Sequence, residues 1–361
     1  MTLKEDYSKK GSVKMERIRF KDYLIDYLEF NNITNKDFAN RIDITPKHLI
    51  DILSGERDIS SNIIDKISLV TNIPADYIYR VEANYKFEKI IEDYLEKENL
   101  TETKYLNKYN YKYLIANNYM KFIDKENKLE IIKDILKFLR VSTPEKVYEI
   151  DKSALYKSNN DKPELLLLWL EKCYRETLEQ TVEEYNKKNI DSLVEYIREV
   201  AKNNEFNEEK LIKKFNENGI YLVIQEDIPG SKIRGAFKVH RGIPAIYLTY
   251  KHHRIADIYF ALLHELAHCK TDFNKAQSMS LVSYEDEIDE TEKNADNQAY
   301  SWMVDEKYYK NICCKDNYRI ETESQYPKAF IVYRLAKDKY IQYSSKQYQL
   351  FNEIIKKQAG S

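Results

Sequence analysis

The sequence predicts a mainly α protein with a small β-sheet, that is, an α+β chain built from several domains. Apolar residues recur at helical spacing over most of the 361 residues, whereas β-branched and aromatic runs bounded by glycine or proline fall between residues 219 and 250. A chain of this length exceeds what one small core uses. We therefore expect a five-helix domain over residues 15–83, a helical connector over 84–205 and an α+β domain over 206–358.

The composition is that of an ordinary globular protein, with 43% hydrophobic and 33% charged residues. A net charge of −2 excludes a strongly basic nucleic-acid coat but leaves a local DNA-binding surface open. The apolar run at residues 165–170 is far shorter than the roughly 20 residues of a membrane span, so we expect no membrane partner. The N-terminus has no apolar signal segment and the four cysteines have no disulfide or zinc spacing, which favours a cytoplasmic protein.

The N-terminal pattern predicts five helices, of which the second and third have helix-turn-helix spacing. The second is expected over Asn35–Ile42 and the third over Thr45–Ser54, with a tight turn between them. Thr45 followed by proline is a typical helix start, and Gly55 a typical stop. The other three helices are expected at residues 20–28, from 60 or 61 to 70, and from 74 onward.

The rest of the chain predicts helices around a short β region. Amphipathic helices are expected at residues 130–139, 164–178 and 190–201, and a further helix at residues 208–218. Three strands are expected near residues 219–225, 235–240 and 243–250. A long helix over 254–270, an acidic loop over 281–290, a helix over 291–304 and a last helix over 340–357 complete the prediction.

The long helix carries His264-Glu265-Leu-Ala-His268. Histidines four residues apart lie about 40° apart around a helix axis, so both imidazoles reach one ion. Glu265 lies outside the ligand pair and is placed to accept a proton from a water beside the ion, which makes it the candidate catalytic residue. The alternative interpretation is a polar helix face with two hydrogen-bonded histidines. With six histidines in the chain, a chance match to this motif is rare.

A catalytic zinc needs a third protein ligand and an open position. No histidine follows His268, so an acidic ligand becomes the leading option, and residues 285–292 offer several. We choose Glu292 because it begins a helix whose inward face also carries two alanines and Asp296. Asp296 is expected to accept a hydrogen bond from a ligand histidine. We expect one zinc ion per chain, with manganese as the alternative ion.

The order of strands, the helix over 254–270 and the segment Glu292-Lys-Asn-Ala-Asp-Asn-Gln-Ala resembles the ImmA/IrrE family of metallopeptidases over roughly residues 207–340. That family joins H-E-x-x-H to a downstream E-x-x-A-[DN]-x-[FQ]-A; Gln298 stands where phenylalanine is usual. The resemblance implies a zincin-like endopeptidase of narrow specificity, with ligands His264, His268 and Glu292 and general base Glu265. It also implies a protein substrate, a partner repressor or antitoxin with its own helix-turn-helix, cut once to relieve repression.

The N-terminal segments Leu53-Ser-Gly-Glu-Arg-Asp-Ile-Ser and Ile73-Pro-Ala-Asp-Tyr-Ile-Tyr resemble the XRE family of phage-repressor-like domains, HigA-type antitoxins in particular. In that family the start of the recognition helix reads bases in the major groove. The positions that this implies for base contact are Thr45, Pro46, Lys47, His48 and Asp51, with Arg57 for phosphate. Residues 1–80 carry as many acidic as basic side chains, so a protein-docking role for this domain stays open.

The leading interpretation is a transcriptional regulator with a zinc-dependent endopeptidase domain, binding duplex DNA and forming a homodimer through its N-terminal or connector helices. The alternative is a HigA-like DNA-binding repressor or antitoxin whose metal domain senses or scaffolds without proteolysis. A structural zinc has no use for Glu265, which favours the first.

Overall fold

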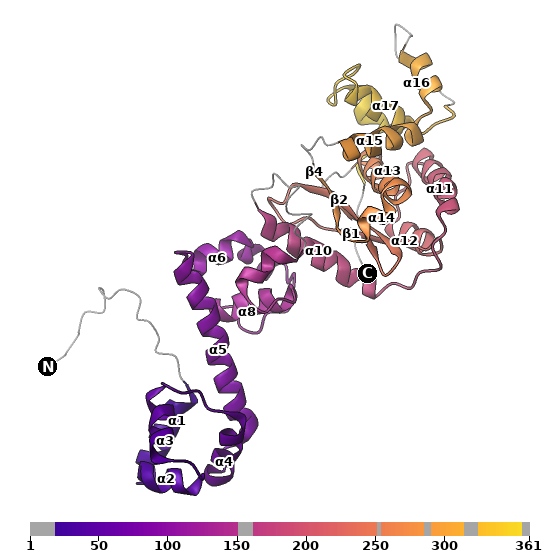
Figure 1. The fold of residues 1–361 in the computed structure, drawn as a ribbon. Helices are drawn as coiled ribbons and strands as arrows, with labels where there is room; N and C mark the ends of the chain where they lie inside the picture. Colours follow the sequence, from indigo (N-terminus) through magenta and orange to yellow (C-terminus); the bar gives the residue numbers. More distant parts are fainter. Residues whose placement is uncertain (1–18, 151–161, 251–253, 285–289, 314–323, 356–361) are drawn as a thin grey trace, which may run out of the picture. The chain divides into compact units, whose positions relative to one another are not determined.

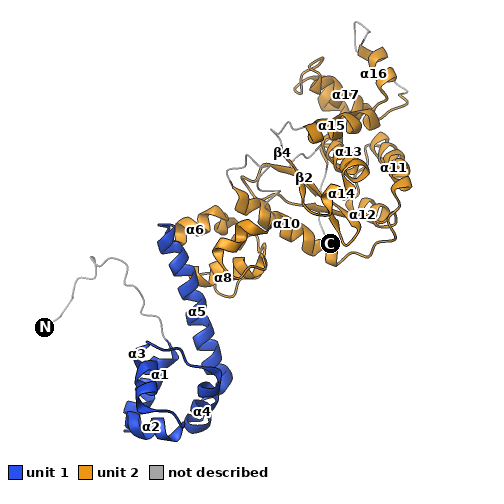
Figure 2. Ribbon diagram, in the orientation of Figure 1, with its two compact units in different colours: residues 1–101 blue, residues 102–361 orange. Residues whose placement is uncertain are grey.

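The computed structural model describes residues 19–150, 162–250, 254–284, 290–313 and 324–355. Contacts between Cα atoms divide the chain into two compact units, residues 1–101 and residues 102–361 (Figure 2). The finer division into three domains stays a prediction.

Unit 1 contains the five expected helices (Figure 1). Thr45 starts the third helix, because its hydroxyl accepts a hydrogen bond from the His48 amide at 3.2 Å, and Gly55 ends that helix with φ 83°. Leu49 and Ile52 are fully buried against the fully buried Phe38 and Ala39. The helices are α1 (Phe20–Phe30), α2 (Asn35–Arg41), α3 (Pro46–Ser54), α4 (Ser61–Thr71) and α5 (Ala75–Lys97).

Unit 2 begins with a helical stretch that contains the amphipathic helices expected from the sequence. Proline at the first position starts α10, and the side chain of Asn207 caps α12 by accepting a hydrogen bond from the Lys210 amide at 2.9 Å. The elements are α6 (Glu102–Lys108), α7 (Tyr111–Ala116), α8 (Lys128–Phe138), the 3₁₀ turns η1 (Pro144–Glu149) and η2 (Lys187–Asn189), α10 (Pro163–Leu178), α11 (Ile190–Lys202) and α12 (Glu208–Asn216).

A four-stranded mixed sheet in the order β1-β3-β2-β4 follows. Its strands are β1 (Tyr221–Gln225), β2 (Ile233–His240), β3 (Ile243–Thr249) and β4 (Leu281–Tyr284). Strands β1 and β3 are parallel, whereas β2 is antiparallel to both β3 and β4. Arg241 and Gly242, both with positive φ, form the two-residue turn that joins β2 to β3.

The prediction of an acidic loop over residues 281–290 is wrong at its beginning. Leu281, Val282 and Ser283 are buried and pair with β2, more than 40 residues earlier in the chain. That pairing is non-local, so the four-residue segment shows no alternation long enough to indicate a strand. Residues 285–289 lie outside the described part of the chain.

The long helix α13 (Ile255–Thr271) packs on one face of the sheet (Figure 1). Phe237 and Val239 of β2 share a hydrophobic core with this helix. Helix α15 (Glu290–Met303) packs on α13 through Ala295 and Ala299. The remaining helices are α14 (Phe273–Ala276), α16 (Glu306–Cys313), α17 (Lys328–Lys337) and α18 (Lys346–Phe351). Among the described residues, no helix has the length and apolar character needed to cross a membrane.

The prediction of one helix over residues 340–357 is wrong. Lys339 has φ 63°, which ends the preceding helical segment, and α18 begins only after Ser345. The Ser345 hydroxyl accepts a hydrogen bond from the Tyr348 amide at 3.3 Å. This serine therefore caps a new helix inside the segment that the apolar spacing had indicated as one continuous helix. Residues 356 and 357 lie outside the described residues.

Candidate metal centre

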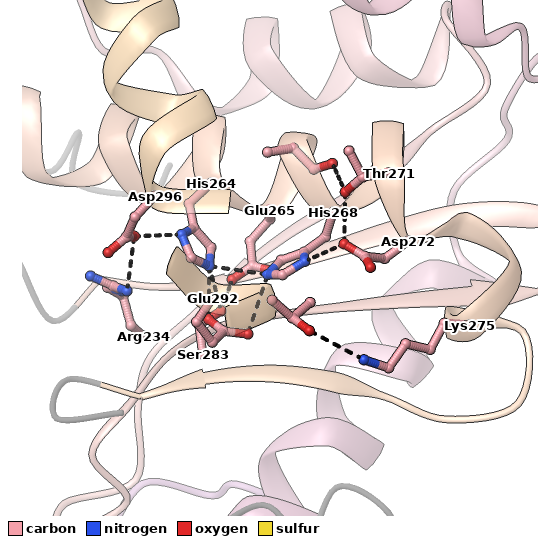
Figure 3. A network of polar contacts seen from close by, with 12 residues as sticks. Arg234, His264, Glu265, His268, Thr271, Asp272, Lys275, Ser283, Glu292 and Asp296 are labelled. Atoms are coloured by element: carbon pink, nitrogen blue, oxygen red, sulfur yellow. Dashed lines mark hydrogen bonds and ion pairs between the residues drawn. The ribbon is translucent and has the colours of Figure 1, made fainter. Parts of the chain in front are cut away.

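Helix α13 places His264 and His268 on one face, and both side chains are fully buried (Figure 3). Their Nε2 atoms lie 3.1 Å apart. The helix is buried along almost its whole length because the residues around the motif are apolar. Two imidazoles in such surroundings need polar partners to offset their lost hydration.

Helix α15 supplies the third group of the cluster. Glu292 is 7% exposed; its Oε2 lies 3.0 Å from Nε2 of His264 and its Oε1 3.3 Å from Nε2 of His268. The buried alanines Ala295 and Ala299, one and two turns further along α15, let the two helices approach closely. The sequence-predicted trio is therefore brought together from two helices.

The geometry of this trio fits a metal ion. Zinc bonds of 2.0–2.1 Å in a tetrahedral site separate neighbouring ligand atoms by about 3.3 Å. The two imidazole nitrogens are 3.1 Å apart, and Glu292 approaches them through different oxygens, Oε2 at 3.0 Å from His264 and Oε1 at 3.3 Å from His268, all close to that value. His264, His268 and Glu292 can thus hold a metal ion, and three protein donors leave one position for another group.

A carboxylate lies on the far side of each imidazole ring. Nδ1 of His264 is 2.8 Å from Oδ1 of Asp296, and Nδ1 of His268 is 3.0 Å from Oδ2 of Asp272. Each Nδ1–H donates to its carboxylate, which leaves Nε2 of both rings free to bind an ion. The structure places Asp296 where the sequence prediction has it. Asp272 was missed, although its position four residues after His268 on a helix was a usable signal.

The candidate base Glu265 is 1% exposed and lies beside the trio. Its Oε1 accepts a hydrogen bond from the Ser283 hydroxyl at 2.7 Å, whereas its Oε2 has no hydrogen-bond partner in the described part of the chain. Strand β2 comes close because Gly235 has no side chain: a Cβ there would lie 2.5 Å from Oε1 of Glu265. Ser283 was not predicted, because its segment was interpreted as a loop.

The charges of the cluster support one another. Burial lowers the pKa of His268, but hydrogen bonds to Asp272 and Glu292 outweigh it and raise that pKa to about 10. For His264, burial is likewise outweighed by bonds to Asp296 and Glu292, so its pKa also rises. Burial raises the pKa of Glu292, yet the bonds from both histidines hold it well below its ordinary range. Without a metal the imidazoles therefore retain protons that a cation would replace.

Burial also acts on Glu265, and here it dominates. It raises the pKa of Glu265 above its ordinary value, against the opposing attraction of His264 and His268. A carboxylate with a raised pKa is a stronger proton acceptor, as a general base requires. The cluster therefore combines three donors that could hold a metal ion with a neighbouring buried carboxylate.

The predicted DNA-contacting residues lie in unit 1, at α3 and just after it. Thr45, Pro46 and Lys47 are exposed at the start of the helix, where the Thr45 hydroxyl is also the helix cap. His48 and Asp51 are half-buried. Arg57 is exposed, and its amide donates a hydrogen bond to the carbonyl of Asp51 at 2.9 Å, which fixes the backbone after α3.

Two short helices joined by a tight turn, with an exposed start to the second helix, define a helix-turn-helix domain. The helix-turn-helix family HTH_3 matches residues 26–78, which cover the second half of α1, all of α2 to α4 and the start of α5. The N-terminal domain is therefore an XRE-type helix-turn-helix DNA-binding domain. Comparisons with curated proteins and with solved structures find no match for this chain.

Proposed function

We propose that this protein is a DNA-binding transcriptional regulator whose second unit is a zinc-dependent endopeptidase. The observation that carries the proposal is Glu265, a buried carboxylate adjacent to the His264, His268 and Glu292 trio without belonging to it. A site that only stored or sensed a metal has no need of a second carboxylate, one of whose oxygens has no hydrogen-bond partner among the described residues. Hydrolysis of a peptide bond does need one, as proton acceptor.

The residues divide the chemistry among them. His264, His268 and Glu292 would hold the zinc, which when bound supplies a Lewis acid that polarises the scissile carbonyl and acidifies water. Glu265 accepts a proton from the attacking water as the water oxygen bonds to the carbonyl carbon. It then returns that proton to the leaving amine as the carbon–nitrogen bond breaks, so the carboxylate ends each turnover unchanged. Asp296 and Asp272 keep the two imidazoles in the orientation that faces Nε2 inward.

The substrate that we propose is a partner repressor or antitoxin with its own helix-turn-helix, cut at a specific bond. The helix-turn-helix of unit 1 brings the chain to promoter DNA, where such partners act. Base contacts are assigned to Thr45, Pro46, Lys47, His48 and Asp51, and a phosphate contact to Arg57.

The test is a cleavage assay on proteins encoded beside this chain's gene, with and without chelator, read by mass spectrometry of the fragments. Glu265→Gln keeps the shape of the side chain and removes the basic carboxylate. This variant should bind zinc normally while cleavage falls by at least roughly 100-fold. Glu164→Gln on α10, a carboxylate only 4% exposed, is the control for loss of a buried charge. Equal cleavage by the wild type and the Glu265→Gln variant would refute the proposed role of Glu265.

A second candidate function is a DNA-binding repressor or antitoxin whose metal centre senses or scaffolds. The burial of His264, His268 and Glu265, each 0–1% exposed, favours it, since a sensor needs no access for a peptide. The two proposals differ in a cellular reporter driven by the adjacent promoter. A sensor predicts an unchanged response with the Glu265→Gln variant, whereas a peptidase predicts that the response to the inducing signal is lost.

A further inference from the structure

Ser283 on β4 makes two contacts inside the candidate centre. Its hydroxyl donates to Oε1 of Glu265 at 2.7 Å and lies 3.1 Å from Nε2 of His264 (Figure 3). The serine is fully buried, as is His264, and Glu265 is 1% exposed. A hydroxyl is thus enclosed between the candidate base and a candidate ligand.

The distance to His264 is informative. At 3.1 Å it falls in the range of 3.0–3.3 Å found between donor atoms of the trio, so the Ser283 oxygen lies at donor spacing from His264. The hydrogen bond to Glu265 is the one that an attacking water would need. The position between Glu265 and His264 can hold one oxygen at a time, either that of Ser283 or that of a water molecule.

We propose that Ser283 is a fourth donor to the metal in the resting protein and that it keeps the centre closed to water. This inference rests on the proposed function, since it assigns a resting state to the same site. It explains how a peptidase of this kind is restrained in a cell: the nucleophile position is filled by the protein itself until β4 is displaced.

Strand β4 is suited to such a displacement. Among the residues that the structure describes, it is an edge strand of four residues that pairs with β2 alone. Its register with β2 shifts between Ile233 and Gly235, and Gly235 is the residue paired with Ser283. An irregularity of this kind weakens the ladder locally and is typical of sheet edges next to active sites. A peptide that took over the edge of β2 would remove Ser283 and free Oε1 of Glu265 together.

The experiment places a thiol at this position and uses cobalt(II) as the probe. In the full-length Ser283→Cys variant, a thiolate that reaches the ion gives an intense near-ultraviolet sulfur-to-cobalt charge-transfer band. The matched control is Ser280→Cys, three residues earlier and 1% exposed. The native Cys269 adjoins His268 but points to the Tyr185 hydroxyl at 3.4 Å, so the wild type supplies the baseline without the band.

The proposal expects the band in Ser283→Cys and neither in Ser280→Cys nor in the wild type. Cobalt binding without the band in Ser283→Cys overturns the fourth-donor assignment and leaves the metal centre standing. Absence of cobalt binding in the wild type overturns both this inference and the proposed function. The two failures are therefore distinguishable.

A second variant tests the closed state without a new donor. Ser283→Ala removes the hydroxyl. Acetohydroxamate, a small metal-binding probe, should therefore bind the cobalt form of this variant more tightly than the cobalt form of the wild type. If the closed state makes up nine-tenths of the wild type, the gain is about tenfold. Equal affinity for the probe in Ser283→Ala and the wild type would show that the serine does not restrict the site.

Discussion

Adding one methyl group at Gly235 should separate the two functions that we propose for the centre, metal retention and proton transfer. The Cβ of alanine would lie 2.5 Å from Oε1 of Glu265, whereas ordinary contact begins at 3.4 Å. The carboxylate must therefore move by about 0.9 Å, and misplacement of a reacting group by about that much can cost on the order of 100-fold in rate. The backbone oxygen of Tyr247, 3.0 Å from the same Cβ, belongs to the paired strand β3 and yields less easily.

The expected phenotype of Gly235→Ala is specific. Zinc content should stay at the wild-type value, because His264, His268 and Glu292 come from α13 and α15. The free energy of unfolding should fall by about 1–3 kcal/mol, the usual cost of overpacking. Cleavage of the substrate that is found among the proteins encoded beside this chain's gene should fall on the order of 100-fold.

The control for Gly235→Ala is Gly242→Ala, at the turn between β2 and β3. Its Cβ would meet no atom within 4 Å, but its φ of 83° makes a side chain there cost about 1–2 kcal/mol. This control should thus lose comparable stability while keeping full activity. The reasoning fails if Gly235→Ala is as active as Gly242→Ala, or if Gly235→Ala loses its zinc.

Three further predictions concern the metal, the pH and the DNA. Protein purified without chelator should contain about one zinc per chain. His264→Ala and His268→Ala should lose the zinc and Glu292→Ala should weaken zinc binding strongly, with the exposed Glu290→Ala as control. Loss of zinc only on substitution of Glu290 or Asp296 would disprove the choice of Glu292. The pKa of His268 is raised to about 10 in the metal-free centre, so binding displaces at least one proton and zinc affinity should rise about tenfold per pH unit around neutrality; a competition titration that shows affinity independent of pH would contradict this. In gel-shift titrations, Lys47→Ala should relax sequence preference and Arg57→Ala should weaken binding uniformly, while equal affinity of the wild type for promoter and random duplex would favour a protein-docking role.

The sequence predicted what local pattern can encode. The two histidines and Glu265 lie within one helical turn or so, and the apolar turns before them indicate burial. Glu292 was chosen because the alanines and the aspartate that share its face repeat at helical spacing. The helix-turn-helix likewise depends on short-range caps and stops, such as Thr45 and Gly55.

What the sequence did not predict depends on contacts between distant segments. Ser283 reaches Glu265 only because β4 pairs with β2, although α13 separates the two strands in the sequence. In the sequence, the four residues of β4 resemble a loop because an acidic run follows them. The role of Gly235 is likewise visible only when β2 lies beside Glu265. Asp272 is different: its spacing from His268 was local, and a search for carboxylates one turn after each histidine would have found it.

The placement of the proposed metal ligands on α13 and α15 has a consequence for the unfolded chain. His264 and Glu292 are 28 residues apart, so an ion held by both acts as a cross-link that closes the intervening segment, β4 included, into a loop. A cross-link removes conformations from the unfolded ensemble, so it increases the equilibrium constant for folding by several-fold or more. Removal of the metal by a chelator should therefore destabilise this region locally. Amide hydrogen exchange in β4 and α15 should become faster before that of α1 to α4 changes.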